Sequence, residues 1–270
     1  MSVDDALIRK LSRQVQAILT EARSEARTGR MRPDLGSPVQ GPLSAIVDHT
    51  LLKPEATARQ IEMLCLEAKE YSFASVCVNS VFVPLALELL NGSTVKVCTV
   101  VGFPLGASLP QVKEYEAEEA LKRGAQEIDM VLHIGALKHR DLVAVFEDIG
   151  DVATICHDHD ALCKVIIETS LLSEEEKILA CLLAKRAGAD FVKTSTGFNG
   201  GGATVEDIAL MRAIVGEGMG VKASGGVRDL ASAQAMVQAG ANRIGTSSGV
   251  AIARAERGEK LNPQHDGTTY

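Results

Sequence analysis

The sequence predicts an α/β protein: a (β/α)8 TIM barrel with an N-terminal helical extension. From residue 44 onward, short β-rich runs alternate with longer helical patterns, which is typical of βα units and a parallel sheet. Eight such units can be counted, and 270 residues are enough for one barrel in a single domain. An open, doubly wound sheet is the main alternative, because alternation alone does not prove that the sheet closes.

The first residues show an amphipathic pattern that lies outside these repeats. Apolar residues recur at spacings of three and four at Leu7, Leu11, Val15, Ile18 and Ala22. Such spacing predicts a helix with one apolar face. The segment TGRMRPDLGSPVQG that follows is rich in Gly and Pro, which indicates a linker. We therefore expect a helix and linker over residues 1–41, the barrel over 42–260, and a flexible tail over 261–270.

Each predicted strand is short, rich in apolar residues and followed by a helical candidate. The eight predicted strands are SAIVDH (44–49), FASVCV (73–78), VKVCTVV (95–101), EIDMVL (127–132), LCKVIIET (162–169), DFVKTS (190–195), GVKAS (220–224) and NRIGT (242–246). Pro110 lies near one helix start, and Ser173 precedes three glutamates at another. Gly188 and Gly240 are placed to end helices before the next strand.

Composition and charge exclude several classes of protein. The formal net charge of -7 disfavours non-specific binding to nucleic acid or to an anionic membrane surface, and no apolar run reaches transmembrane length. Six cysteines without a C-x-x-C pair, and the absence of a signal-peptide pattern, favour a reducing cytoplasm. No G-x-G-x-x-G turn follows the first predicted strand and no G-x-x-x-x-G-K-[ST] loop occurs, which argues against nucleotide chemistry.

Ionisable residues occur late in three otherwise apolar strands, where barrel enzymes place their catalytic groups. They are Asp129, Lys193 and Lys222. Burial and a neighbouring positive charge both disfavour the ammonium form of a lysine, and the neutral amine can attack an aldehyde to form an imine. A carboxylate such as Asp129 could move protons through bound water. The alternative is that both lysines reach solvent at the barrel rim and that Asp129 neutralises them.

Gly and Ser/Thr follow the late strands in three segments. They are KTSTGFNGGGAT (193–204), ASGGVR (223–228) and RIGTSSG (243–249). Backbone amides and hydroxyls in such turns can surround an anion, and barrels frequently bind phosphate in the loops after strands seven and eight. Each turn alone could be ordinary turn geometry. Together the three segments predict a phosphate site.

Motifs along nearly the whole predicted barrel resemble the deoxyribose-phosphate aldolase family of class I aldolases. They are DHTLLKPEAT (48–57), VCTVVGFPLG (97–106), EIDMVLHIGAL (127–137), KVIIET (164–169), FVKTSTGF (191–198), VKASGGVR (221–228) and RIGTSSG (243–249). The resemblance covers about residues 42–260. It implies a lyase that reversibly cleaves 2-deoxy-D-ribose 5-phosphate to D-glyceraldehyde 3-phosphate and acetaldehyde, in deoxyribose catabolism, without a metal or another cofactor.

The resemblance also implies roles for individual residues. Lys193 would form the Schiff base, Lys222 would favour its neutral amine and take part in proton transfer, and Asp129 would act through a water. Asp48 would contact a substrate hydroxyl or a lysine. The expected contacts to substrate, including its phosphate, come from Asp48, Lys164, Thr196, Gly225, Gly226, Gly245, Ser247, Ser248 and Tyr270.

At two positions the residue roles known for the family cannot be transferred directly to this sequence. Phe198 stands where some family members have a lysine that could bind phosphate, which leaves more of that task to amides and hydroxyls. Tyr270 ends the chain, as a tyrosine does in family members whose C-terminal tail reaches the active site. A disordered polar tail is an equally good interpretation of this segment. Alternation puts Lys164 on the same strand face as Ile166 and Glu168, so we expect Lys164 to point into the barrel in a supporting charge role, and a Lys164–Glu168 pair could be purely structural. The run CHDHD (156–160) has poor spacing for a metal, and we assign no metal site.

Three other functions remain open at this point. They are a Schiff-base aldolase with a different phosphorylated acceptor, a phosphosugar isomerase that uses a carboxylate base, and a non-catalytic phosphosugar-binding barrel. The last has no need of two buried lysines. The expected ligand is a small phosphorylated sugar or aldehyde, and the expected assembly is a homodimer or homotetramer.

Overall fold

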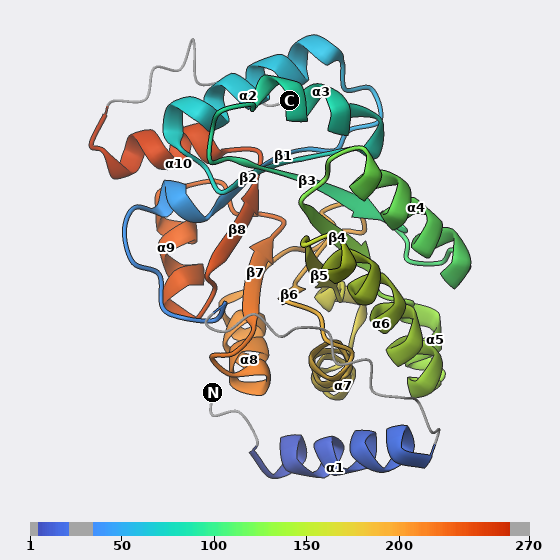
Figure 1. Ribbon diagram of the computed structural model, residues 1–270. Helices are drawn as coiled ribbons and strands as arrows, with labels where there is room; N and C mark the ends of the chain where they lie inside the picture. The colour runs from blue at the N-terminus through green and yellow to red at the C-terminus, as the bar shows by residue number, and fades with distance from the viewer. Residues whose placement is uncertain (1–4, 22–34, 260–270) are drawn as a thin grey trace.

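Eight parallel strands form a closed barrel in this computed structural model, which describes residues 5–21 and 35–259 (Figure 1). Each strand pairs with the next one in the chain, and β8 pairs back onto β1 in the register Val47↔Ile244 and Asp48↔Gly245. This closure confirms the predicted TIM barrel and excludes the open sheet. It also brings the carboxyl ends of all eight strands to one face of the molecule.

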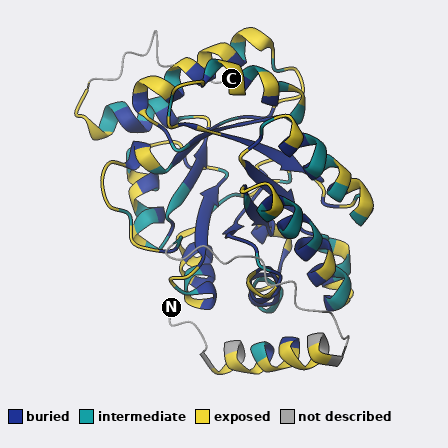
Figure 2. Ribbon diagram, in the orientation of Figure 1, coloured by how far each residue is buried: buried dark blue, intermediate teal, exposed yellow. Residues whose placement is uncertain are grey.

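The predicted alternation of strands and helices is confirmed throughout the barrel. The strands are β1 Val47–Leu51, β2 Ser75–Val78, β3 Lys96–Val101, β4 Glu127–Val131, β5 Leu162–Ile166, β6 Phe191–Lys193, β7 Gly220–Ser224 and β8 Arg243–Thr246. The α-helices are α1 Asp5–Glu21, α2 Ala58–Tyr71, α3 Val83–Leu89, α4 Pro110–Lys122, α5 Ile134–Lys138, α6 Leu142–Asp158, α7 Glu174–Arg186, α8 Val205–Val215, α9 Leu230–Gln238 and α10 Gly249–Glu256. The strands are buried, and the helices around them expose their outer faces (Figure 2).

The two largest differences from the predicted strand boundaries have local reasons. β1 begins at Val47 because Leu43–Ile46 form a 3-10 turn, in which the amide of Ala45 donates to the carbonyl of Pro42 at 3.1 Å. β5 ends at Ile166, and Glu168 then adopts the left-handed conformation at φ 56°. This conformation breaks the alternation of side chains that a longer strand would have.

The predicted helix ends are confirmed where the sequence is punctuated. Pro110 is the first residue of α4, a position at which a missing N–H costs nothing. Ser173 and Glu176 form a capping box at the start of α7. Gly188 and Gly240 follow α7 and α9 with φ of 87° and 112°, conformations that favour glycine.

The predicted N-terminal helix is α1, which packs outside the barrel against α6 and α7 (Figure 1). Leu11 and Val15 are buried there, and the Arg186 guanidinium donates to the side-chain oxygen of Gln16. The side chains of Leu7 and Ile18, and all of Ala22, lie outside the described residues. The same holds for the predicted tail beyond residue 260 and for residues 28–34 of the predicted linker. Where it is described, the extension therefore covers barrel helices and does not reach the face that carries the strand ends.

Candidate active site

Three charged side chains from three strands meet inside the barrel. Asp129 of β4 holds its Oδ2 2.7 Å from Lys193 Nζ of β6 and 2.7 Å from Lys222 Nζ of β7. The in-register pair Lys193↔Lys222 places the two lysines side by side on neighbouring strands. The structure thus brings the three predicted catalytic residues into direct contact around one carboxylate oxygen.

This trio belongs to a larger buried network of ion pairs. Lys164 Nζ lies 2.8 Å from Asp129 Oδ1 and 2.7 Å from Glu127 Oε2. Lys222 Nζ lies 2.5 Å from Asp48 Oδ2. Arg243 joins the remaining ends, because its Nε lies 2.6 Å from Asp48 Oδ1 and its Nη2 lies 2.6 Å from Glu127 Oε2. The ion pairs close into a ring through the barrel interior.

The closed ring has six members, three of each sign. They are the cations Lys164, Lys222 and Arg243 and the carboxylates Asp48, Glu127 and Asp129. Lys193 is attached to this ring through Asp129 as a fourth cationic group. Each of the other three cations contacts two carboxylates of the ring, whereas Lys193 contacts one.

Carboxylates reverse the effect of burial on the other lysines. Burial alone would raise the pKa of Asp129, but the three surrounding lysines outweigh it and hold that pKa well below its ordinary value. Burial alone would lower the pKa of Lys222, but Asp129 and Asp48 outweigh burial and raise it above its ordinary value. The pKa of Lys164 is raised against burial in the same way, chiefly by Asp129. Lys222 is therefore an ammonium ion, although the sequence suggested that burial would favour its neutral form.

Lys164 and Glu168, which alternation places on one strand face, do not pair. Lys164 bonds Glu127 and Asp129 instead, because Glu168 follows the end of β5 in a left-handed conformation and no longer shares the strand face of Lys164. The buried Glu168 carboxylate accepts from the hydroxyl of Thr196 at 2.5 Å and from Asn199 Nδ2 at 2.9 Å. Glu168 thus holds the loop between β6 and α8.

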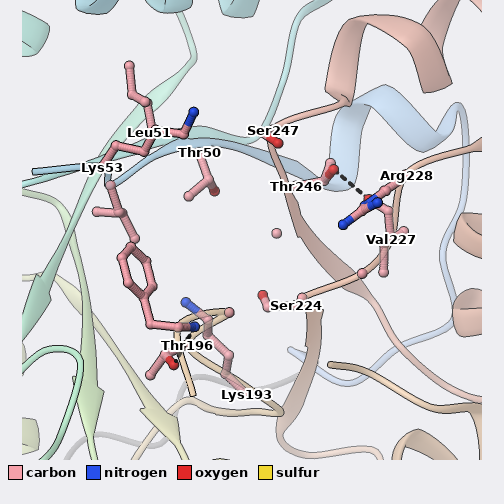
Figure 3. A pocket seen from close by; sticks show the side chains of 16 residues that line it. Thr50, Leu51, Lys53, Lys193, Thr196, Ser224, Val227, Arg228, Thr246 and Ser247 are labelled. Carbon is pink, nitrogen blue, oxygen red and sulfur yellow. Dashed lines mark hydrogen bonds between the residues drawn. The ribbon is translucent and has the colours of Figure 1, made fainter. Parts of the chain in front are cut away.

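A cavity of about 440 Å³ opens above the ring at the carboxyl ends of the strands (Figure 3). That volume is within the usual range for small-molecule sites. The predicted residues that line it are Lys193, Thr196, Gly225, Gly226, Gly245 and Ser247. Lys193, which is attached to the ring through Asp129, reaches the cavity with 4% of its side chain exposed.

The other predicted residues lie elsewhere. Asp129 and Lys222 are fully buried beneath the cavity, and so are Asp48 and Lys164, which do not line it. Ser248 precedes α10, and its amide donates to the hydroxyl of Thr246 at 2.9 Å. Tyr270 lies outside the described residues.

The cavity suits an anionic ligand. Lys193, Lys53 and Arg228 contribute positive charges to its lining, which includes no carboxylate in the described part of the chain. Gly225 and Gly226 follow β7 with φ of 84° and 79°, and successive residues in such turns can present their amides to an anion. The N-terminal end of α10 follows β8 directly after Ser248, and such helix ends attract anions.

Sequence reasoning missed several residues of the lining, among them Lys53, Ser224 and Arg228. Lys53 and Arg228 follow the ends of predicted strands one and seven, and a cation at that position was an available signal. Phe198 also lines the cavity, and its ring meets that of Phe103 edge-on at 5.2 Å between centroids. An apolar contact between two loops thus occupies the position where some family members have a lysine.

The histidines of the CHDHD run take part in local contacts. His157 Nε2 lies 3.0 Å from Asp190 Oδ2, and His159 Nδ1 lies 3.0 Å from the Ile155 carbonyl. Among the described residues, one group with metal-ligand spacing is Cys77, Cys98 and Asp129. Its carboxylate already contacts three lysines, whose positive charges oppose a further cation.

Comparisons with known proteins agree with this geometry. The model of the DeoC/LacD family aldolases matches residues 43–256. A deoxyribose-phosphate aldolase from Halalkalibacterium halodurans is 62% identical over 218 residues, which cover 80% of this chain and 97% of that protein. One from Streptococcus gordonii is 61% identical over 214 residues, covering 79% of this chain and 96% of the relative.

Among solved structures, the tetrameric deoxyribose phosphate aldolase from Aeropyrum pernix superposes with a TM-score of 0.75 at 36% identity. The superposition covers 80% of this chain and 91% of that one. The family match extends over far more than half of this sequence, and the relatives are covered almost completely. The chain therefore belongs to the DeoC/LacD family of aldolases.

Proposed function

We propose that this protein is a class I aldolase that reversibly cleaves 2-deoxy-D-ribose 5-phosphate to D-glyceraldehyde 3-phosphate and acetaldehyde. The observation that carries the proposal is the single-carboxylate contact of Lys193 at the floor of a cationic cavity. Its amine contacts the cavity and can therefore reach the carbonyl of a bound sugar. The relatives that are about 60% identical to this chain over the aligned residues are named for this activity.

The buried ring supplies the remaining chemistry. Lys193 attacks the carbonyl carbon and forms a carbinolamine, which loses water to give the imine. Asp129 Oδ2 contacts both Lys193 and Lys222, so that a proton can pass between the two lysines through the carboxylate or a water beside it. Lys222 enters the reaction as an ammonium ion and becomes a neutral amine when it gives up this proton, while Asp48 and Lys164 keep Lys222 and Asp129 in position.

The phosphate of the substrate belongs at the opposite side of the cavity. Gly225, Gly226, Gly245 and Ser247 provide amides and hydroxyls there, and Arg228 provides charge. Ser248 contributes through the start of α10.

We propose that the reaction takes place in the cytoplasm, which accords with six cysteines that are all buried free thiols. Within the described part of the chain, none of the helices has the length and apolar character needed to span a lipid bilayer.

Borohydride reduction in the presence of 2-deoxy-D-ribose 5-phosphate tests the mechanism. We expect a covalent adduct on Lys193, located by mass spectrometry of a peptide digest, together with release of acetaldehyde when borohydride is omitted. Turnover without an adduct would point to the phosphosugar isomerase, which needs no imine. An adduct on Lys222 would exchange the roles of the two lysines. Faster cleavage of a phosphorylated sugar other than 2-deoxy-D-ribose 5-phosphate would identify another Schiff-base aldolase.

We also propose that the chain assembles as a homodimer or homotetramer through the outer face of α4. Val112 and Tyr115 of α4 and Val81 beside α3 are 50%, 69% and 75% exposed and line one groove. Exposed apolar groups gathered in this way mark contact surfaces. The relative from Aeropyrum pernix is described as tetrameric, which favours a second copy of this chain as the occupant.

Tyr115→Asp combined with Val112→Asp is expected to shift the protein toward the 28.6 kDa monomer, because a carboxylate buried in an apolar interface loses its hydration. Sedimentation velocity measures the change. Leu66→Asp is the matched control, since Leu66 is 56% exposed on α2, away from this groove. A wild-type monomer, or an assembly that the double variant leaves intact, would exclude this surface.

A further inference from the structure

The hydroxyl of Ser224 is a buried polar group for which the fold provides no partner. Ser224 is 5% exposed, and its Oγ makes no hydrogen bond with any described residue. The residue nevertheless lines the cavity, and its oxygen is directed into it (Figure 3). Because buried hydroxyls are nearly always hydrogen-bonded, an unpartnered one at the wall of a binding site calls for an explanation.

The threonine hydroxyls of this lining are already engaged. Thr50 donates to the carbonyl of Asp48 at 2.8 Å, and Thr246 donates to the carbonyl of Val227 at 2.6 Å. Thr196 donates to the Glu168 carboxylate. Ser224 thus differs from these three threonines in having its hydroxyl free for a ligand.

The backbone of Ser224 is held in place, so that the hydroxyl has a defined position. The amide of Ser224 donates to Thr194 Oγ1 at 3.0 Å, and that hydroxyl donates to the carbonyl of Ser224 at 2.9 Å. On the neighbouring strand β8, a Cβ on Gly245 would lie 2.3 Å from Ser224 Oγ and 3.0 Å from Lys222 Cε. The oxygen therefore occupies space that exists only because residue 245 is a glycine.

This position lies between the reacting lysines and the proposed phosphate turn. Ser224 follows Lys222 by two residues on the same face of β7, a separation of about 6.6 Å along a strand. The Gly225–Gly226 turn begins directly after it. Consider a substrate whose carbonyl carbon is bonded to Lys193 and whose phosphate lies at this turn. The carbon that lies next to Ser224 is then the one adjacent to the phosphate-bearing carbon.

We propose that Ser224 Oγ hydrogen-bonds the substrate hydroxyl on that carbon, which is C4 of the deoxypentose phosphate and C2 of D-glyceraldehyde 3-phosphate. The inference rests on the proposed aldolase function and names a residue that selects its acceptor. A serine hydroxyl can both donate and accept, which suits a partner hydroxyl. A site built for such a bond discriminates against an acceptor that lacks the hydroxyl.

The test compares two acceptors in the synthetic direction, with acetaldehyde as donor. We expect the wild-type protein to prefer D-glyceraldehyde 3-phosphate over 3-phosphooxypropanal, which lacks the C2 hydroxyl. Ser224→Ala should lower kcat/KM for D-glyceraldehyde 3-phosphate about tenfold, the effect of losing one hydrogen bond. It should leave 3-phosphooxypropanal and the borohydride adduct of acetaldehyde on Lys193 unchanged.

Ser195→Ala is the matched control, because Ser195 is also buried with an unpartnered hydroxyl but does not line the cavity. It should leave the acceptor preference as in the wild type. An equal loss with both acceptors in Ser224→Ala, or no loss with either, would overturn the assignment. A wild-type protein that joins acetaldehyde to neither acceptor would instead refute the proposed function itself.

Discussion

Lys193→Met is expected to abolish cleavage of 2-deoxy-D-ribose 5-phosphate, with kcat reduced by at least about 10³-fold. Methionine fills much of the same volume but has no amine, so that no imine can form. The variant should fold, because Asp129 keeps Lys164 at 2.8 Å and Lys222 at 2.7 Å as partners. Steady-state kinetics and the borohydride adduct measure the effect, and both signals should disappear together.

A lysine outside the site provides the comparison for this prediction. Lys138 is 46% exposed and pairs with Glu176 at 3.0 Å on the outside of the barrel. Lys138→Met should therefore retain wild-type turnover and the adduct. If Lys193→Met retained turnover and the adduct moved to Lys222, the second lysine would be the nucleophile.

The arrangement of Asp129, Lys193 and Lys222 was predictable because parallel strands carry their carboxyl ends to one face. A charged residue near the end of an apolar strand points to that face, and closure of the barrel follows from repetition of the βα unit. The prediction needed only the order of residues within each strand. For this reason the contact of these three residues could be expected before any distance was known.

Other features depend on contacts between distant segments. The bond from Arg243 to Asp48 joins residues 195 positions apart, and neither strand alone indicates it. The unpartnered hydroxyl of Ser224 depends on the missing Cβ of Gly245 on the neighbouring strand. Alternation left a Lys164–Glu168 pair open, because it does not reveal the left-handed turn at Glu168 that takes this residue off the strand face. Such contacts follow from the closed barrel and not from local patterns.

Asp129→Asn is expected to affect both activity and stability. The amide cannot serve as the shared base between Lys193 and Lys222, and we expect kcat to fall about 10²- to 10⁴-fold. It also removes the counter-charge from three buried lysines. Breaking a buried ion pair from one side typically lowers the free energy of unfolding by about 3–5 kcal/mol, and urea denaturation at neutral pH measures this loss.

The pH dependence of stability distinguishes this electrostatic effect from a packing defect. The pKa of Asp129 is held well below its ordinary value in the folded protein, so its contribution to stability is present above the unfolded pKa of about 3.9. That contribution is lost as the pH falls toward the folded pKa. The difference in stability between the wild type and Asp129→Asn should therefore shrink below about pH 4, whereas a packing defect would leave it constant. Glu175→Gln removes the exposed pair with Arg140 and should cost less than about 1 kcal/mol, because solvent already screens both charges.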